Sequence, residues 1–145
     1  MRVSAKGEYA VKAMLDLALH YEKGLIPIQE IAARQAIPHR YLEQVLLLLK
    51  RAGFLISKRG SAGGYHLLRA PSEITVGSVL RTIEGSLDRS EPGRRRAAGH
   101  DSSQLAELWA EVSAAVSEVI DRITFEDLRK RVEARQNAAR PMYHI

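Results

Sequence analysis

The chain has 145 residues and a formal net charge of +5, enough for one ordinary domain with an appended segment. It contains no cysteine, which excludes disulfides, thiolate catalysis and zinc or iron–sulfur sites with cysteine ligands. It has no run of eighteen apolar residues and no signal-peptide-like beginning, so we expect a cytoplasmic protein that makes no membrane contact.

The positive charge is concentrated in one segment of the chain. Residues 34–69 contain seven Lys or Arg side chains and one carboxylate, Glu43, so this segment carries more net positive charge than the whole chain. Such a concentration is typical of a surface that binds a polyanion. A solvated basic face is the alternative interpretation.

Three helices are predicted in the first third of the chain. Apolar side chains recur at three- and four-residue steps over residues 5–22 and again, more briefly, over 28–35. A third helix is predicted over 38–52, with Pro38 in its first turn and Gly53 just after its end. This order of helices predicts a helix-turn-helix.

The third helix is amphipathic when its residues are projected at about 100° per residue. Its apolar side comprises Tyr41, Leu42, Val45, Leu46, Leu48, Leu49 and Ala52. Its polar side comprises His39, Arg40, Glu43, Gln44, Lys50 and Arg51. Leu47 falls within the polar side, where it either touches a thymine methyl group or is an isolated exposed leucine.

A β-hairpin is predicted directly after the third helix. Its strands are residues 54–57 and 65–68, and a glycine-rich connection joins them. That connection contains Lys58, Arg59, Gly60, Gly63 and Gly64. The predicted fold class is therefore mostly α with a small β-hairpin, that is, a winged helix-turn-helix with a long dimerisation helix after it.

The second half of the chain predicts a linker between two further helical regions. Residues 75–84 form an amphipathic helix with Thr75 as its cap, and a glycine- and charge-rich linker follows. The helical period returns over residues 103–123, and a last helix begins after Thr124 with Asp127 in a capping-box position. The expected domains are 1–85 for DNA binding, 86–102 for the linker, 103–137 for dimerisation and 138–145 for the tail.

The long helix carries one apolar side over more than five turns. We expect this side to pack on a second copy of the chain, with packing on the subunit's own core as the alternative. The predicted dimerisation residues are Leu105, Leu108, Trp109, Val112, Val116, Val119, Ile120 and Ile123.

The polar side of the third helix and the hairpin suit the two grooves of duplex DNA. The residues expected in the major groove are His39, Arg40, Glu43 and Gln44. Lys50, Arg51 and Lys58 are expected on phosphates, and the minor-groove wing is Arg59 with Gly60, Gly63 and Gly64. The alternatives are that the polar side of the third helix is simply solvated and that the hairpin connection is an ordinary glycine-rich turn. The five histidines show no metal-ligand or catalytic spacing, so we expect no metal, no cofactor and no enzyme activity.

Four stretches of the chain resemble the Rrf-two family of bacterial winged-helix regulators. They are "MRVSAKGEYAVKAMLDLA", "IPIQEIAARQAIPHRYLEQVLLLLKRAGFL", "KRGSAGGYHLLR" and "ITVGSVLRTIEG". The resemblance implies a homodimer with its recognition helices and wings on a two-fold related operator in double-stranded DNA, and we expect this operator to be an A·T-rich pseudo-palindrome. It also places Arg40, Glu43 and Gln44 at base-reading positions and Arg59 at the minor-groove position.

The linker departs from the cluster-binding members of that family. Those members place three cysteines there, whereas this chain has "RSEPGRRRAAGHDSS", so the resemblance points to the cysteine-free branch that regulates cysteine metabolism. The segment Tyr143, His144 and Ile145 is similar to the end of the cysteine-metabolism repressor, and it implies cysteine synthase (O-acetylserine sulfhydrylase) as a partner. A disordered end is the alternative.

The expected function is therefore that of a homodimeric transcription repressor without an iron–sulfur cluster. The alternative is a winged-helix adaptor that acts by docking its tail into cysteine synthase.

Overall fold

The computed structural model describes residues 3–85 and 103–139. Over these residues the protein is mostly helical with a single two-stranded antiparallel sheet, which confirms the predicted fold class. The elements are α1 (Ala5–Leu19), α2 (Ile28–Gln35), α3 (His39–Arg51), β1 (Leu55–Lys58), β2 (Gly64–Leu67), α4 (Val76–Glu84), α5 (Ser103–Arg122) and α6 (Phe125–Ala139). Two short 3-10 turns, Tyr21–Lys23 and Pro71–Glu73, lie between them.

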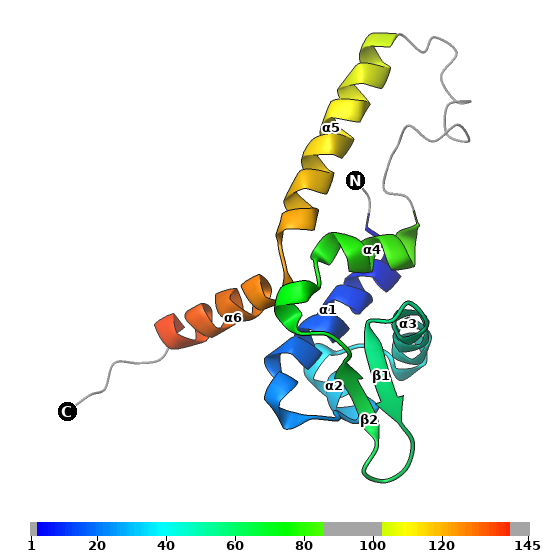
Figure 1. Ribbon diagram of the computed structural model, residues 1–145, viewed down its shortest axis with the longest axis vertical. Helices are drawn as coiled ribbons and strands as arrows, with labels where there is room; N and C mark the ends of the chain where they lie inside the picture. Colours follow the sequence, from blue (N-terminus) through cyan, green and yellow to red (C-terminus); the bar gives the residue numbers. More distant parts are fainter. Residues whose placement is uncertain (1–2, 86–102, 140–145) are drawn as a thin grey trace, which may run out of the picture.

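Helices α1 to α4 and the hairpin form one body, and α5 projects from it (Figure 1). Helix α1 runs through the middle and contacts α2, α3 and α4. Helix α3 and the β1–β2 hairpin lie at one end of the body, and α5 extends away from them. The two candidate DNA-contacting elements therefore lie together, on the side opposite the projecting helix.

Helix α1 ends three residues earlier than the sequence predicts. Nδ1 of His20 lies 2.8 Å from the Asp16 carbonyl oxygen, and the backbone N–H of His20 also donates to that oxygen. The chain then continues as the Tyr21–Lys23 turn and leaves it at Gly24, where φ is 76°. A side chain therefore satisfies a C-terminal carbonyl of α1, and the apolar period of the sequence runs on into the turn.

The predicted helix caps are confirmed. The Thr75 hydroxyl accepts a hydrogen bond from the Ser78 backbone N–H at 3.2 Å, which starts α4. Before α6, the Thr124 N–H donates to Asp127 Oδ2 at 3.0 Å, and the Asp127 N–H donates to the Thr124 hydroxyl at 3.1 Å. This reciprocal pair is a capping box, in which each partner satisfies a donor that the helix leaves unpaired.

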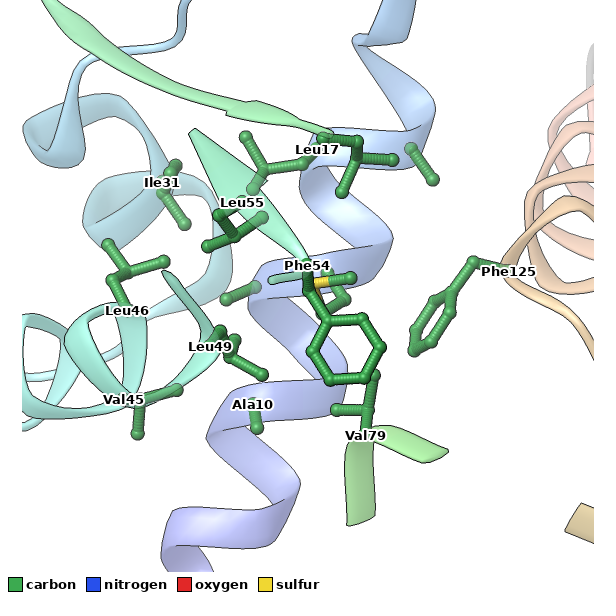
Figure 2. Packing of buried hydrophobic residues seen from close by; sticks show 14 of the residues in the cluster. Ala10, Leu17, Ile31, Val45, Leu46, Leu49, Phe54, Leu55, Val79 and Phe125 are labelled. Atoms are coloured by element: carbon green, nitrogen blue, oxygen red, sulfur yellow. The ribbon is translucent and has the colours of Figure 1, made fainter. Parts of the chain in front are cut away.

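The core is formed where α1, α3, the hairpin and α4 meet (Figure 2). Its fully buried side chains include Met14 of α1, Leu46 of α3 and Val79 of α4, each with no exposed area. Figure 2 also shows Phe125, from the start of α6, with its ring directed into this cluster. Truncating such a buried side chain to alanine typically costs about 2–5 kcal/mol.

Three residues assigned to the apolar side of α3 are not in the core. Tyr41 is 41% exposed, Ala52 is also exposed and Leu48 is half-buried, whereas Leu42, Val45, Leu46 and Leu49 are fully buried. The predicted apolar side was too wide because Tyr41, Leu48 and Ala52 lie along one edge of it. The contact that α3 makes with α1 covers a narrower stripe.

An ion pair between a buried aspartate and a partly exposed arginine fixes α2 on α1. Asp16 has no exposed area and receives two hydrogen bonds from Arg34, Nε to Oδ1 and Nη2 to Oδ2, both at 2.9 Å. Gln35 Nε2 adds a third bond to Oδ1 at 3.2 Å. The hydrogen bond to Asp16 raises the pKa of the Arg34 guanidinium. Because α2 precedes α3, this pair helps to set the helix-turn-helix on its scaffold.

Backbone hydrogen bonds join the C-terminal end of α5 to the body. The Val76 N–H donates to the Ile123 carbonyl at 2.9 Å, and the Phe125 N–H donates to the Ile74 carbonyl at 3.0 Å. On the surface, Arg81 of α4 pairs with Asp121 of α5, with Nη2 to Oδ2 at 3.0 Å, and this bond raises the pKa of Arg81. The root of α5 is thus attached to α4 and to the strand-like segment before it.

Candidate nucleic-acid interface

The outward side of α3 carries a continuous row of exposed side chains. We call this row the α3 polar face, and its members are His39, Arg40, Glu43, Gln44, Leu47, Lys50 and Arg51. It lies opposite the four fully buried residues of the same helix. Leu47 is 45% exposed and lies among the polar side chains, so α3 presents hydrogen-bonding groups and one apolar group on the same surface.

The first turn of α3 is organised by two aromatic rings. Nη2 of Arg40 donates to the Tyr41 hydroxyl at 3.2 Å, and Cζ of Arg40 lies 5.1 Å from the centroid of the Tyr41 ring. The Tyr41 ring in turn stacks on Tyr9 of α1, with centroids 6.2 Å apart and planes at 28°. His39, the first residue of α3, also contacts the next turn, where its Nδ1 lies 3.3 Å from Glu43 Oε1. The helical period of the sequence did not indicate that Tyr9 would stack on Tyr41.

The hairpin is closed by antiparallel pairing from Leu55 with Leu67 to Lys58 with Gly64. The observed strands lie one residue closer to the tip than those predicted. Arg59 and Gly60 follow β1 at the exposed tip, and Gly60 has a φ of 108°.

Two of the three wing glycines are explained by close approach of the protein's own backbone. A Cβ on Gly63 would lie 2.1 Å from the Lys58 carbonyl oxygen, and a Cβ on Gly64 would lie 2.4 Å from the Ile26 carbonyl oxygen. Gly64 also has a φ of 156°. A Cβ on Gly60 would meet nothing within 4 Å. Gly63 and Gly64 are therefore required by close backbone approach within the protein, and Gly60 is the one whose surroundings are open.

The wing is held against the helix-turn-helix. Ile26, in the segment before α2, exchanges two backbone hydrogen bonds with Tyr65 of β2, at 2.8 and 2.9 Å. His66 Nε2 lies 2.9 Å from the Tyr21 carbonyl oxygen, and its ring stacks on Tyr21 at 5.0 Å. A groove of about 290 Å³ runs between the wing and the first turn of α2, with Lys58 and Gln29 among its lining residues.

The cations of this surface are available to an external anion. Lys50, Arg51, Lys58 and Arg59 are all exposed. No carboxylate within residues 3–85 and 103–139 forms an ion pair with any of them. Arg34 and Arg81, by contrast, are each paired with an aspartate.

Helix α5 exposes a large apolar area. Leu105, Leu108, Trp109 and Val119 are 47%, 45%, 39% and 43% exposed, respectively. The other residues of this row are Val112, Val116 and Ile123, which are half-buried, and Ile120, which is 8% exposed. At helical spacing, all eight residues share one side of α5, which we call the α5 apolar face. Ile120, near the C-terminal end of the helix, is the one buried member of this face.

Several predicted features lie outside the described residues. They are the linker 86–102 and the tail with Tyr143, His144 and Ile145. Within the described residues there is no group of three or more His, Cys, Asp or Glu side chains that could hold a metal ion. No helix in that part of the chain is long and apolar enough to cross a membrane.

Comparison with known proteins places this architecture among bacterial regulators. A family described as "Rrf2: Iron-dependent Transcriptional regulator" matches residues 3–131. The HTH-type transcriptional regulator IscR of Pectobacterium carotovorum is 39% identical over 129 residues, which cover 88% of this chain and 79% of that protein. The structure of T. potens IscR is 38% identical with a TM-score of 0.81, covering 99% of this chain and 97% of the other. The structure of CymR (YrzC), the global cysteine regulator of B. subtilis, is 34% identical with a TM-score of 0.80, covering 90% and 98%.

Proposed function

This chain belongs to the Rrf2 family of DNA-binding, winged-helix transcription regulators, and from that membership we propose that it is a homodimeric repressor of an A·T-rich pseudo-palindromic operator. Like its relatives, it is a transcription regulator and not an enzyme. The observation that carries the proposal is that α3, with its exposed polar face, packs beside the wing, whose cations have no carboxylate partner in the described part of the chain.

The proposed base-reading residues are Arg40, Glu43 and Gln44 in the major groove. Arginine pairs with guanine O6 and N7, glutamine with adenine N6 and N7, and glutamate accepts from cytosine N4. Their positions in the first two turns of α3 support this role, because recognition helices meet base edges near their N-terminal ends. Leu47, one turn further on, is proposed to contact a thymine methyl group.

The remaining cations are proposed to bind the sugar–phosphate backbone and the minor groove. Lys50 and Arg51 extend from the last turn of α3, and Lys58 lines the groove beside the first turn of α2, where helix N–H groups favour phosphate. Arg59 at the wing tip is proposed to enter the minor groove, whose negative potential is strongest in narrow A·T-rich stretches.

The α5 apolar face is the proposed dimer interface. Its exposed leucines and tryptophan form a patch of the kind that marks protein–protein contact sites. A two-fold axis through such a contact would present two α3 helices to one duplex, with half-sites separated by about 34–36 Å per helical turn of DNA.

Iron dependence, which the family's description names, does not fit this chain in the form of a cysteine-ligated cluster. Such clusters are held by cysteine thiolates, and the chain has none. The described residues contain no alternative group of three donors. We therefore propose that the signal reaches the protein through a partner or a small ligand.

A role in cysteine metabolism is the finer part of the proposal. It is supported by the likeness to the global cysteine regulator of B. subtilis. Cysteine synthase as a partner rests on the resemblance of the Tyr143-His144-Ile145 segment alone. The adaptor alternative finds no support in the comparisons, whose members are named as transcription regulators. Deleting residues 143–145 should abolish co-elution with cysteine synthase and leave operator affinity unchanged; retained co-elution would remove this partner.

The wing provides the test of the DNA-binding geometry. An operator is first selected from random duplexes, and Arg59→Ala is then titrated against it. We expect a loss of about 1–3 kcal/mol at A·T-flanked sites. Arg131→Ala removes the same charge from an exposed position on α6 that forms no ion pair within the described residues, and it should leave affinity unchanged. Equal effects of the two substitutions would show that Arg59 contributes charge alone and would remove the wing from the mechanism.

A further inference from the structure

Arg40 stands at the N-terminal turn of α3 and is held by its neighbour in sequence. Its Nη2 donates to the Tyr41 hydroxyl at 3.2 Å, and its guanidinium carbon lies 5.1 Å from the Tyr41 ring centroid. Tyr9 of α1 stacks on the same ring from the body of the protein. A column of Tyr9, Tyr41 and Arg40 therefore extends from the scaffold to the α3 polar face.

Such a column reduces the rotamer entropy that an exposed arginine loses when it binds a base. A free arginine side chain has about 2 kcal/mol of rotamer entropy, much of which is lost when it binds a base. A guanidinium already stacked and hydrogen-bonded to a fixed ring loses less when it binds. Tyr41 is itself held, because its ring is packed on a helix of the core.

The geometry leaves most of the guanidinium free. One of its five N–H donors is used by the Tyr41 hydroxyl, so the others remain for the O6 and N7 acceptors of a guanine. Arg40 and Tyr41 are both exposed, so the pair orients the guanidinium without burying it. Glu43 of the same face is next to His39 and does not pair with Arg40.

We propose that Tyr41, braced by Tyr9, is a positioning residue that presents Arg40 to a guanine and so sets the sequence preference at the base pair read by the first turn of α3. This inference rests on the proposed function, because it names the base that one residue of the same site prefers. Tyr41 acts through Arg40 and itself recognises no base.

The test compares two hydroxyl deletions on stacked rings. Tyr41→Phe removes the acceptor of Arg40 and keeps the ring, whereas Tyr9→Phe removes a hydroxyl for which the structure gives no hydrogen bond. Each full-length variant is titrated with the selected operator carrying either guanine or 7-deazaguanine, which lacks N7, at each guanine of a half-site. The affinity for a random-sequence duplex and the salt dependence of binding are measured alongside.

For the wild-type protein we expect about tenfold discrimination against 7-deazaguanine at one position, within the range for bidentate base contacts. Arg40→Ala should abolish it. Tyr41→Phe should reduce it about threefold, with random-duplex affinity and salt dependence unchanged, and Tyr9→Phe should behave as wild type. The double variant Arg40→Ala/Tyr41→Phe should lose no more than Arg40→Ala alone, because Tyr41 acts through Arg40.

Other outcomes separate the failure of this inference from the failure of the proposed function. If the wild-type protein does not prefer its selected operator over a random duplex, the proposed function fails. If it does, but Tyr41→Phe leaves the discrimination unchanged or increases it, the positioning role is wrong. If Arg40→Ala keeps the discrimination against 7-deazaguanine while Tyr41→Phe lowers it, Tyr41 does not act through Arg40 and the inference is also wrong.

Discussion

The α1–α4 body and helix α5 differ in how they treat their apolar side chains. In the body, the buried cluster takes side chains from every helix and both strands and also includes Phe125 of α6, and the exposed large apolar residues are Tyr41, Leu47, Ile56 and Leu68. On α5, four large apolar residues are at least 39% exposed along one side. The body thus buries most of its apolar side chains, whereas α5 presents an apolar surface that the described part of one subunit leaves exposed.

In the proposed function, this difference corresponds to two roles. The body contains the Asp16–Arg34 pair and the Ile26–Tyr65 bridge, which hold the candidate DNA-contacting elements in place. Helix α5 is the proposed dimer contact, and its C-terminal end is hydrogen-bonded to the body. Changes in the body should therefore alter stability, and changes on the α5 apolar face should alter association.

The largest effect should come from Arg34→Ala in the body. It leaves the Asp16 carboxylate buried with a single side-chain donor, Gln35, so we expect a loss of about 3 kcal/mol in the free energy of unfolding. Urea unfolding followed by circular dichroism measures it. The control Arg131→Ala should change stability by less than about 0.5 kcal/mol. A comparably small effect of Arg34→Ala would mean that the pair does not organise the body.

Leu108→Asp should act on association instead. We expect the dimer dissociation constant to rise by at least about 30-fold, or about 2 kcal/mol, because both copies carry the charge at the contact. Sedimentation equilibrium measures the constant. Ala114→Asp adds the same charge on the opposite, exposed side of α5 and should leave it unchanged. If both variants remain dimeric, the α5 apolar face is not the interface.

Leu47→Ala tests whether a lone exposed leucine differs from the row on α5. We expect oligomeric state and stability to be unchanged. The preference for thymine over uracil at one operator position should fall about fourfold, because one methyl-sized apolar contact contributes about 0.8 kcal/mol. Leu68→Ala, which truncates an exposed leucine outside α3, should keep the preference. Retention of the preference in both variants would mean that Leu47 reads no thymine.

The smallest effect should come from the ion pair that joins the two regions. Arg81 and Asp121 are 38% and 46% exposed, so a double-mutant cycle with alanine at both sites should give a coupling of about 0.2–1 kcal/mol. Urea unfolding of the four proteins measures it. A coupling above about 2 kcal/mol would make the pair a structural requirement and weaken the distinction between body and α5.

Local patterns predicted the elements well because their causes are local. The period of α3, the Thr75 cap and the Thr124–Asp127 capping box each depend on residues within a few positions of one another. The edges of the apolar stripe were less predictable. Tyr41 lies at such an edge, and its exposure depends on how closely α1 approaches α3.

Contacts between distant residues could not be predicted in this way. Asp16 is buried because Arg34, eighteen positions later, reaches back to it, and no spacing rule marks that pair. Gly64 is required because the backbone of Ile26 passes close to it, a neighbour that the hairpin sequence does not contain. From its place in the sequence Gly64 belongs to the predicted minor-groove wing, and the fold supplies a reason for this glycine within the protein.

Within the part of the chain that the structure describes, backbone hydrogen bonds attach α5 to the body at its C-terminal end, so the helix can tilt about that end as a lever. Its pivot is the pair of backbone bonds between the segment around Val76 and the segment around Ile123. A helix of 20 residues is about 30 Å long, so a tilt of about 10° at the pivot moves its far end by about 5 Å. In a two-fold assembly joined along this helix, the same rotation changes the span between the two copies of α3. Anything that binds at the pivot can therefore tune the fit to a fixed length of duplex without altering any residue that touches it.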